Sequence, residues 1–194
     1  MPRPENAPRL RVDVVRSPLG PLRLVCDETG ALVALDWDEN DERLTRTLAR
    51  HGDAPALVRE KNPSGVSRVL DAYFGGDVEC IDSLQVASRG TPFQERVWNG
   101  LRRIPAGTTL SYGALATKIG NPKAVRAVGM ANHRNPVGIV VPCHRVIGSN
   151  GELTGYAAGV ERKAWLLEHE ARHAKAGPGR QLQLGGVSAG ALRS

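Results

Sequence analysis

The sequence predicts an α+β N-terminal domain, a small antiparallel sheet with helices, followed by a mainly α C-terminal domain that contains a helix-turn-helix. Residues 10–88 alternate short apolar runs with tight turns, whereas residues 91–173 have helical spacing broken by Gly and Pro. The charge changes at the same place, because residues 1–90 carry a net charge of −3 and residues 91–150 one of +7. With 194 residues, the chain is long enough for two small cores.

Short strands and two helices are expected in the first domain, after a flexible N-terminus at residues 1–9. Asp41–His51 and Pro63–Phe74 have the apolar spacing of helices, and glycines follow both segments. Val78–Ile81 is expected to add a short strand. Three alternating segments separated by turns predict the antiparallel sheet: Leu10–Val15, Leu22–Cys26 and Ala31–Trp37.

The second domain opens with a signal for the start of a helix. Thr91 can act as the N-cap, Pro92 suits the first helical position, and Gln94 completes a capping box. The helix is expected to run to about Arg103, because Pro and Gly follow shortly after.

Two short helices joined by a glycine-containing turn then form a helix-turn-helix pattern. Ser111 is expected to cap the first helix, which ends near Ile119. After the turn, Asn121 is expected to cap the second helix, which runs from Pro122 to about His133.

The rest of the domain is expected to contain one extended run and one long helix. Gly138–Val141 is the apolar extended run, and it leads directly to Cys143. A Gly-rich loop follows, and then a last helix at Val160–Ala174. Residues 174–194 are expected to be a disordered basic tail.

Composition indicates a soluble, globular, intracellular protein. Hydrophobic residues make up 41% and charged residues 24% of the chain, and no apolar run is long enough to span a bilayer. The first residues lack the apolar region of a signal peptide. Three cysteines are too few, and odd in number, for a disulfide scaffold. We therefore expect a cytoplasmic location and no membrane partner.

The basic stretch at residues 91–150 suits contact with a polyanion, although a solvated basic face is the alternative. Gly129 in the second helix of the pair would cost about 1 kcal/mol relative to Ala. Either close approach to a partner or packing against another helix would explain a small residue there. The same side of this helix is small at several further positions: Ala124, Ala127 and Ala131.

Cys143 is the candidate nucleophile. A thiol reacts as the thiolate, and His144, Arg145 or a helix N-terminus could lower its pKa. A Cys–His pair oriented by an acid is a general nucleophile arrangement, and a buried, inert cysteine is the alternative. Four acids in this half could supply the third group: Glu152, Glu161, Glu168 and Glu170.

No metal or cofactor site is predicted. The histidines and cysteines lack the spacing of zinc ligands, and no Gly-rich phosphate-binding loop occurs. Cys26 and Cys80 lie among apolar residues and are expected to belong to the core.

The segment Ile139–Ile147 is similar to the active-site signature of the methylated-DNA–protein-cysteine methyltransferases, the O6-alkylguanine-DNA alkyltransferases. The resemblance is strong over residues 91–171 and weak over 10–90, chiefly at Ser17–Gly20. It implies a helix-turn-helix of winged-helix type. Further segments resemble the family in chain order: Ser111-Tyr112-Gly113, Gly120–Gly129, Asn135-Pro136, Thr154-Gly155-Tyr156 and Lys163–Glu170.

The resemblance implies single-turnover repair of double-stranded DNA that bears O6-alkylguanine, and also of O4-alkylthymine. The helix-turn-helix would enter the minor groove. Arg126 would replace the flipped nucleotide, and Tyr112 would press on the phosphate beside it and later protonate the leaving guanine. The implied DNA-binding residues are Ser111, Tyr112, Lys123, Arg126, Ala127, Ala131 and Arg134.

The family mechanism implies that Cys143 attacks the alkyl carbon and keeps the group as a thioether, without a cofactor. His144 would take the thiol proton through a water, and Glu170 would orient His144. Asn135 would tie the active-site loop to the helix-turn-helix. The implied pocket for the flipped base consists of Trp98, Val141, Pro142, Tyr156, Ala157 and Ala158.

Three departures from the family limit what carries over. Ala157 stands where some members have a serine, which leaves substrate breadth open. Some members bind zinc through the N-terminal domain, but only Cys26 lies near such a ligand position, so no metal is predicted. The cysteine-rich domain of the sensor forms is absent from this sequence.

Two other functions stay open at this point. One is a non-reactive sensor of alkyl lesions that binds DNA, although such proteins typically replace the reactive cysteine with tryptophan. The other is a Cys–His hydrolase, which would need an oxyanion hole. The protein is expected to be a monomer, and to be associated with the nucleoid if bacterial. The sequence leaves open whether it binds cooperatively along DNA.

Overall fold

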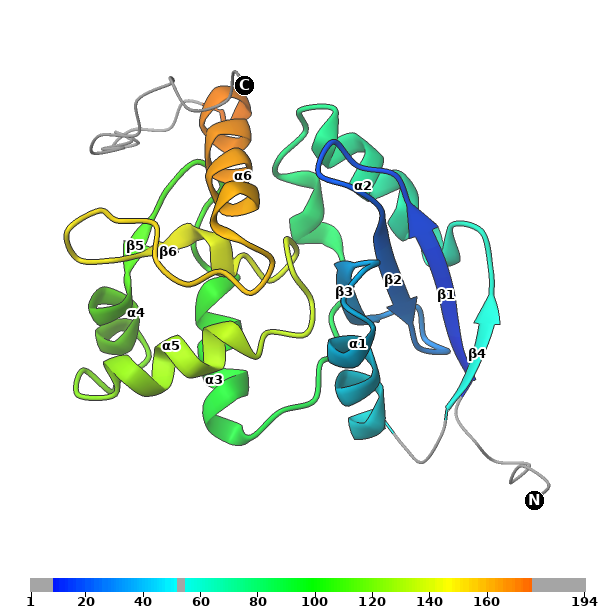
Figure 1. Cartoon of the computed structure of the whole chain (residues 1–194), viewed down its shortest axis with the longest axis horizontal. Coiled ribbons are helices and arrows are strands. Elements are labelled where there is room, and N and C mark those ends of the chain that lie inside the picture. Colours follow the sequence, from blue (N-terminus) through cyan, green and yellow to red (C-terminus); the bar gives the residue numbers. More distant parts are fainter. Residues whose placement is uncertain (1–8, 52–54, 176–194) are drawn as a thin grey trace.

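The computed structural model describes residues 9–51 and 55–175. Figure 1 shows two bodies side by side: a sheet with two helices, and a helical body that ends in a long helix. The expected flexible N-terminus and basic tail lie almost entirely outside the described residues. Within the described part of the chain, no helix is long and apolar enough to cross a membrane.

Three strands form the predicted antiparallel ladder, but the sheet as a whole is mixed. A fourth strand, β4 (Ala56–Arg59), pairs in parallel with the first, so the order is β3-β2-β1-β4. The sequence missed β4 because it has only four residues, none of them buried, and therefore shows no alternation of buried and exposed positions. The antiparallel strands are β1 (Arg9–Val15), β2 (Leu22–Cys26) and β3 (Leu32–Trp37).

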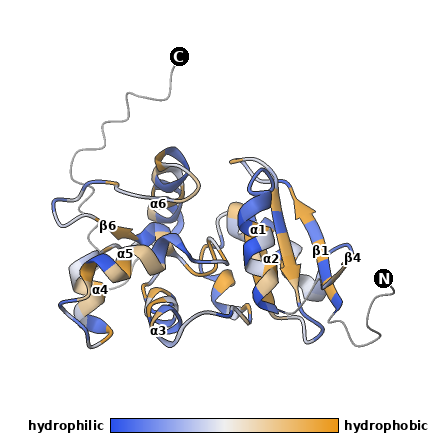
Figure 2. Ribbon diagram, turned by 60° about the horizontal axis from the view of Figure 1, so that its bottom comes forward, coloured by the Kyte–Doolittle hydropathy of each residue, from blue (hydrophilic) through white to orange (hydrophobic). Residues whose placement is uncertain are grey.

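Two helices accompany the sheet, as predicted. Helix α1 (Asp41–Leu48) continues as a short 3-10 turn over Ala49–His51, and α2 (Val66–Phe74) follows a 3-10 turn over Pro63–Gly65. The sheet and α1 differ in hydropathy, because the strands are largely hydrophobic and α1 is largely hydrophilic (Figure 2).

The predicted strand over Val78–Ile81 is wrong. The segment turns after α2 and enters a 3-10 helix over Cys80–Ser83, begun by a hydrogen bond from Cys80 N to Asp77 O of 3.2 Å. Val78 and Ile81 are both buried and lie three residues apart, which is a helical rather than a strand spacing.

The first two helices of the C-terminal domain begin where the sequence predicts. In α3 (Pro92–Leu101), the capping box is complete, because Gln94 N donates to Thr91 Oγ1 at 3.3 Å and Thr91 N donates to Gln94 Oε1 at 3.0 Å. In α4 (Tyr112–Lys118), Ser111 Oγ accepts from Ala114 N at 3.1 Å. Both N-caps are therefore confirmed.

The second helix of the helix-turn-helix, α5 (Val125–His133), starts later than predicted. Ala124 precedes it with no side-chain cap, so the predicted cap by Asn121 is wrong. Instead, Ala124 N donates a hydrogen bond of 3.0 Å to the main-chain oxygen of Asn121, which closes a turn before the helix. The remaining elements are the parallel pair β5 (Leu110–Ser111) and β6 (Val146–Ile147) and the helix α6 (Val160–His173).

The edge of the sheet meets the segment that precedes Cys143. Leu35 N in β3 donates to Pro136 O at 3.0 Å, and Gly138 N donates back to Leu35 O at 2.8 Å. The predicted extended run at Gly138–Val141 is wrong, because these residues form tight turns and Val141 N donates to Val137 O at 2.9 Å. The N-terminal domain thus holds this turn in place.

Candidate active site

Glu170 is the centre of a buried polar network beneath Cys143. Its Oε1 lies 2.9 Å from His144 Nε2, and the same oxygen accepts from Tyr73 Oη at 2.9 Å. Arg145 donates to both carboxylate oxygens, from Nε at 2.9 Å and from Nη2 at 2.8 Å. The fourth partner is Gly107, whose main-chain N donates to Glu170 Oε2 at 3.3 Å. Glu170 is fully buried, so four protein partners replace the water molecules that would otherwise solvate its carboxylate.

Gly107 shows how closely the chain is fitted around this carboxylate. Its φ is +69°, and a Cβ there would lie 2.6 Å from Ala174 Cβ and 3.2 Å from Glu170 O. Only glycine adopts this conformation readily and leaves the main chain close enough to donate to Glu170. The Pro-Ala-Gly break after α3 therefore contributes a hydrogen-bond donor to the network.

The network fixes the state of His144. Burial alone would raise the pKa of Glu170, but the hydrogen bond from His144 and the charge and hydrogen bonds of Arg145 hold it well below its usual value. Burial lowers the pKa of His144, and Glu170 only partly offsets this. A neutral imidazole beside an ionised carboxylate donates from Nε2, which leaves the lone pair on Nδ1. This buried Nδ1 has no protein partner, so it is free to accept a proton.

Cys143 is held by a different residue, Asn135. Asn135 Nδ2 donates to Cys143 Sγ at 3.2 Å and to Val141 O at 2.7 Å, while its Oδ1 accepts Val137 N at 3.1 Å. The main chain of Cys143 is fixed as well, because Asn132 Nδ2 donates to its carbonyl at 3.2 Å. The thiol and the imidazole thus sit on one 3-10 turn, Cys143–Arg145, but face different partners.

The thiol is protonated at neutral pH. Burial raises the pKa of Cys143, and the hydrogen bond from Asn135 and the charges of Arg43 and Lys163 do not compensate. The prediction that Arg145 could lower this pKa is not supported, because its guanidinium is turned to Glu170. A reaction at Cys143 therefore needs a base, and His144 Nδ1 is the neutral base nearest in the chain.

The turn before Cys143 is strained. Ile139 is fully buried and has a φ of +66°, which is a rare conformation for a β-branched residue. Such a residue costs on the order of 1–3 kcal/mol and persists only where its surroundings impose it. The sheet edge at Leu35 and the side chain of Asn135 supply that constraint through the hydrogen bonds above.

Two tyrosines pack against the core that contains Cys143, and a lysine shares the carbonyl of Thr154 with one of them. Burial raises the pKa of Tyr112, whose hydroxyl lies 3.4 Å from Thr154 O, and that of Tyr156, whose hydroxyl is buried without a partner. Lys163 donates to Val146 O at 2.7 Å and to Thr154 O at 2.8 Å, and burial lowers its pKa to about 8.

Nothing in the described part of the chain resembles a metal centre. Among residues 9–51 and 55–175, no three His, Cys, Asp or Glu side chains are arranged to hold a metal ion. The structure forms no disulfide there either, since all three cysteines are free.

Both domains match known protein families. Residues 10–88 match "6-O-methylguanine DNA methyltransferase, ribonuclease-like domain", and residues 92–172 match "6-O-methylguanine DNA methyltransferase, DNA binding domain". The chain belongs to the 6-O-methylguanine DNA methyltransferase family.

Relatives of this family resemble the chain over nearly their whole length. The methylated-DNA–protein-cysteine methyltransferase of Salmonella typhimurium is 51% identical over 164 residues, which cover 84% of this chain and 96% of the relative. The protein of the same name from Methanosarcina acetivorans is 44% identical over 169 residues, covering 81% and 96%.

Solved structures of the methyltransferase family agree in fold. The O6-methylguanine methyltransferase of Mycobacterium tuberculosis is 41% identical, with a TM-score of 0.71 over 87% of this chain and 96% of that one. The same protein in a crystal with DNA gives a TM-score of 0.69 at 40% identity, over 86% and 94%. The predicted two-domain fold and the predicted family are thus confirmed.

Most of the DNA-binding residues expected of a methyltransferase lie on the surface of the helix-turn-helix. Ala131 does not, because it is 2% exposed and its carbonyl accepts Trp98 Nε1 at 2.9 Å. The small residues of α5 thus divide between an outer face with Ala127 and an inner face with Ala131, and the inner one serves packing. The remaining predicted residues are exposed or half-buried: Ser111, Tyr112, Lys123, Arg126, Ala127 and Arg134.

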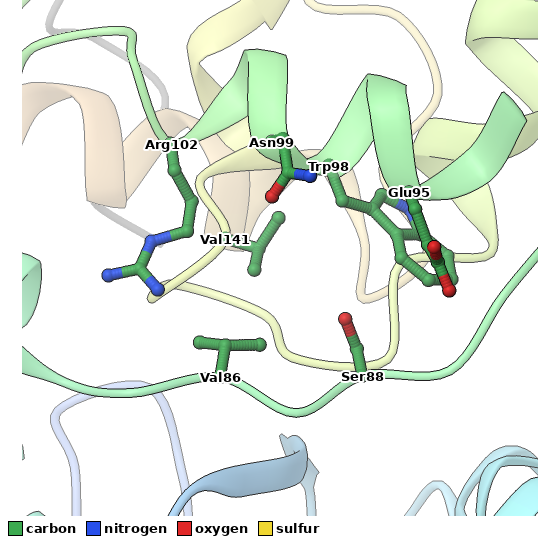
Figure 3. Close-up of a pocket in the computed structure, with 7 residues that line it drawn as sticks. All are labelled: Val86, Ser88, Glu95, Trp98, Asn99, Arg102 and Val141. Carbon is green, nitrogen blue, oxygen red and sulfur yellow. The ribbon is translucent and has the colours of Figure 1, made fainter. Parts of the chain in front are cut away.

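The residues predicted to form the base pocket of the methyltransferase lie in two places in the structure. Trp98 and Val141 line a surface pocket between α3 and the linker that joins the domains (Figure 3), together with Val86, Ser88, Glu95, Asn99 and Arg102. Cys143 and Tyr156 are not among the residues that line that pocket, although Trp98 and Cys143 belong to the same buried core. The other predicted residues belong to the chain on either side of Cys143: buried Pro142 before it, and half-buried Tyr156, Ala157 and Ala158 before α6.

Four residues of the site were not predicted from the sequence, and a fifth, Arg145, was predicted to act on Cys143 rather than on Glu170. Tyr73 and Arg145 bind Glu170, and Lys163 binds two carbonyls of the loop. Trp37 packs edge-on against Tyr156, with ring centroids 6.2 Å apart. Arg43 donates to Asn135 O and forms an ion pair with Asp36 at 2.7 Å. One signal that could have found Lys163 is its spacing, because it lies three and four residues before Leu166 and Leu167 and therefore on the buried face of α6.

Proposed function

We propose that this chain repairs O6-alkylguanine in double-stranded DNA by transferring the alkyl group to Cys143, once per molecule. The observation that carries the proposal is the arrangement around Cys143 in a member of this family. The thiol accepts from Asn135, and the adjacent His144 is held by an ionised Glu170 with Nδ1 unpaired. Nucleophile, base and orienting acid are the three parts that nucleophilic catalysis requires.

The transfer needs no cofactor. The bond from the alkyl carbon to guanine O6 breaks as a bond from that carbon to Cys143 Sγ forms. The thiol proton passes to His144 Nδ1 through a water, because no direct hydrogen bond joins the two side chains. Burial keeps Tyr112 protonated at neutral pH, so its phenol can give a proton to the departing guanine. The product is a thioether, which water does not hydrolyse, and the protein is consumed.

Duplex DNA is the partner in this proposal. We propose that α5 enters the minor groove, and that exposed Arg126 takes the place of the flipped nucleotide. O4-alkylthymine is proposed as a second lesion, since it carries an alkyl group on the corresponding oxygen. We further propose that the protein is a cytoplasmic monomer, associated with the nucleoid if it is bacterial. A non-reactive sensor is not favoured, because Cys143 is present and held as a nucleophile.

We expect Arg126→Ala to slow transfer from duplex DNA by about 100-fold, because base flipping costs a few kcal/mol that the side chain would no longer offset. Tyr112→Phe should act in the same direction. Arg126→Ala should leave the reaction with free O6-benzylguanine unchanged, since a free base needs no flipping. Tyr112→Phe should slow that reaction in part, because Tyr112 also gives a proton to the departing guanine. Single-turnover rates with both substrates measure this, with Arg68→Ala on the exposed face of α2 as the matched control. Equal slowing with both substrates would contradict the flipping roles.

The pH dependence of the reaction with free O6-benzylguanine tests the base. Because the pKa of His144 lies below its usual value of about 6.5 and that of Cys143 above about 8.5, the neutral pair prevails between these limits. The rate should be flat across this range and fall only at lower pH, as His144 takes up a proton. A tenfold rise per pH unit from about pH 7 to pH 9 would indicate attack by a free thiolate without His144.

A further inference from the structure

Helix α1 of the N-terminal domain presents a row of arginines beside the C-terminal end of α5, the second helix of the helix-turn-helix, which we call the recognition helix. Arg43, Arg46 and Arg50 lie three and four residues apart, so they share one face of α1 and the 3-10 turn that follows. They line a small groove that is closed on its other side by His133 and Arg134, at the C-terminal end of α5. We call this groove, with Thr47 as its remaining member, the α1 basic groove.

The positive charge in the α1 basic groove is largely uncompensated. Arg43 is paired with Asp36, but within the described part of the chain no ion pair engages Arg46, Arg50 or Arg134, and no carboxylate lines the groove. The linker adds a further cation, because Arg50 Nη1 donates to Arg89 O at 3.3 Å and Arg89 Nη1 donates to Arg50 O at 3.5 Å. Like charges held together repel one another and weaken the fold unless an anion binds.

The groove continues the face that α5 turns to solvent. Arg126 and Arg134 are eight residues apart, which is about 12 Å along a helix. Beyond Arg134 the chain enters the turn that Arg43 holds, and α1 lies there at the side of the N-terminal domain that faces α5 (Figure 1). A duplex that follows α5 and extends past its C-terminal end would therefore bring its backbone to α1. DNA carries about one negative charge per 1.7 Å of axis, so it would meet this groove with several phosphates.

We infer that the α1 basic groove is a second DNA contact, in which Arg46 and Arg50 bind phosphates of the duplex beyond the recognition helix. The N-terminal domain would then enlarge the DNA-binding surface and strengthen binding to any sequence, because phosphate contacts carry no base information. The inference rests on the proposed function, since it takes α5 to be the element that enters the DNA.

Salt-dependent binding to an unmodified duplex tests the inference. Each phosphate contact contributes about 0.9 to the slope of log affinity against log salt, so Arg46→Ala with Arg50→Ala should lower the slope by about 2. At about 0.1 M salt the affinity should fall by tenfold or more. Lysine at both positions should keep most of the affinity, whereas Arg68→Ala, in a groove lined by Asp13 and Asp71, should change nothing. An unchanged slope in the double variant would overturn the inference.

The reaction with free O6-benzylguanine separates this inference from the proposed function. Arg46 and Arg50 do not touch Cys143 or its partners, so the double variant should react with the free base at the rate of the unaltered protein. That result also shows that the variant is folded. If the unaltered protein transfers no alkyl group from duplex O6-methylguanine, the proposed function is wrong. If it reacts, and the double variant binds DNA normally, only the second DNA contact is wrong.

Discussion

Replacing Glu170 with glutamine is expected to destabilise the protein by about 3–5 kcal/mol, because it leaves a buried Arg145 without its anion. Arg145 is 1% exposed and has no second carboxylate within the described network. Transfer should also slow, on the order of 100-fold, because His144 loses the carboxylate that holds its proton on Nε2. Urea unfolding measures the first effect, and single-turnover kinetics at a temperature where both proteins are folded measure the second.

Tyr73→Phe is the matched control for Glu170→Gln. It removes one hydrogen bond to the same oxygen but leaves the ion pair intact, so it should cost only about 1 kcal/mol. Transfer should be almost unchanged, since Tyr73 does not contact His144. If Glu170→Gln unfolds at the same urea concentration as the unaltered protein and reacts as fast, the network does not do what we assign to it.

Replacing Cys143 with alanine is expected to abolish alkyl transfer completely while leaving DNA binding unchanged. The thiol accepts a single hydrogen bond, from Asn135, and lies behind the helix-turn-helix rather than on its exposed face. The variant should therefore fold and bind a duplex with the affinity of the unaltered protein. Gel-shift titration and transfer of a labelled methyl group measure the two properties on the same DNA.

Cys80→Ala is the control for the loss of a thiol. Burial raises the pKa of Cys80 and of Cys26 to about 11, so neither forms a thiolate near neutral pH. Removal of Cys80 should leave the amount of methyl transferred per molecule unchanged. Residual transfer in Cys143→Ala, or a loss of transfer in Cys80→Ala, would show that the acceptor is another residue.

Local signals predicted the parts of the fold that local interactions determine. The capping box at Thr91 and Gln94 and the cap at Ser111 satisfy main-chain groups within three residues, so the sequence pattern and the structure coincide. The antiparallel strands joined by tight turns were predictable for the same reason. Asn121 failed as a cap because the turn after α4 uses its main-chain oxygen, and helix α5 starts at Val125, three residues after the predicted start at Pro122.

Contacts between distant segments decided the rest, and no short pattern reports them. Tyr73 reaches Glu170 across 97 positions, and Arg43 reaches Asn135 across 92. Ile139 takes a conformation that its residue type disfavours, because the edge of β3 and Asn135 fix the turn around it. The motif with Cys143, His144 and Glu170 was found through resemblance to a family, and the residues that hold it were found only in the fold.

The central claim is that Cys143 is the acceptor of the alkyl group, and intact-mass spectrometry tests it most directly. The protein is incubated with excess duplex that carries O6-methylguanine, weighed intact, and then digested to locate the change. We predict a gain of one methyl group per molecule, located on Cys143, with no further gain on longer incubation. An unchanged mass, or a methyl group on any residue other than Cys143, would contradict the account.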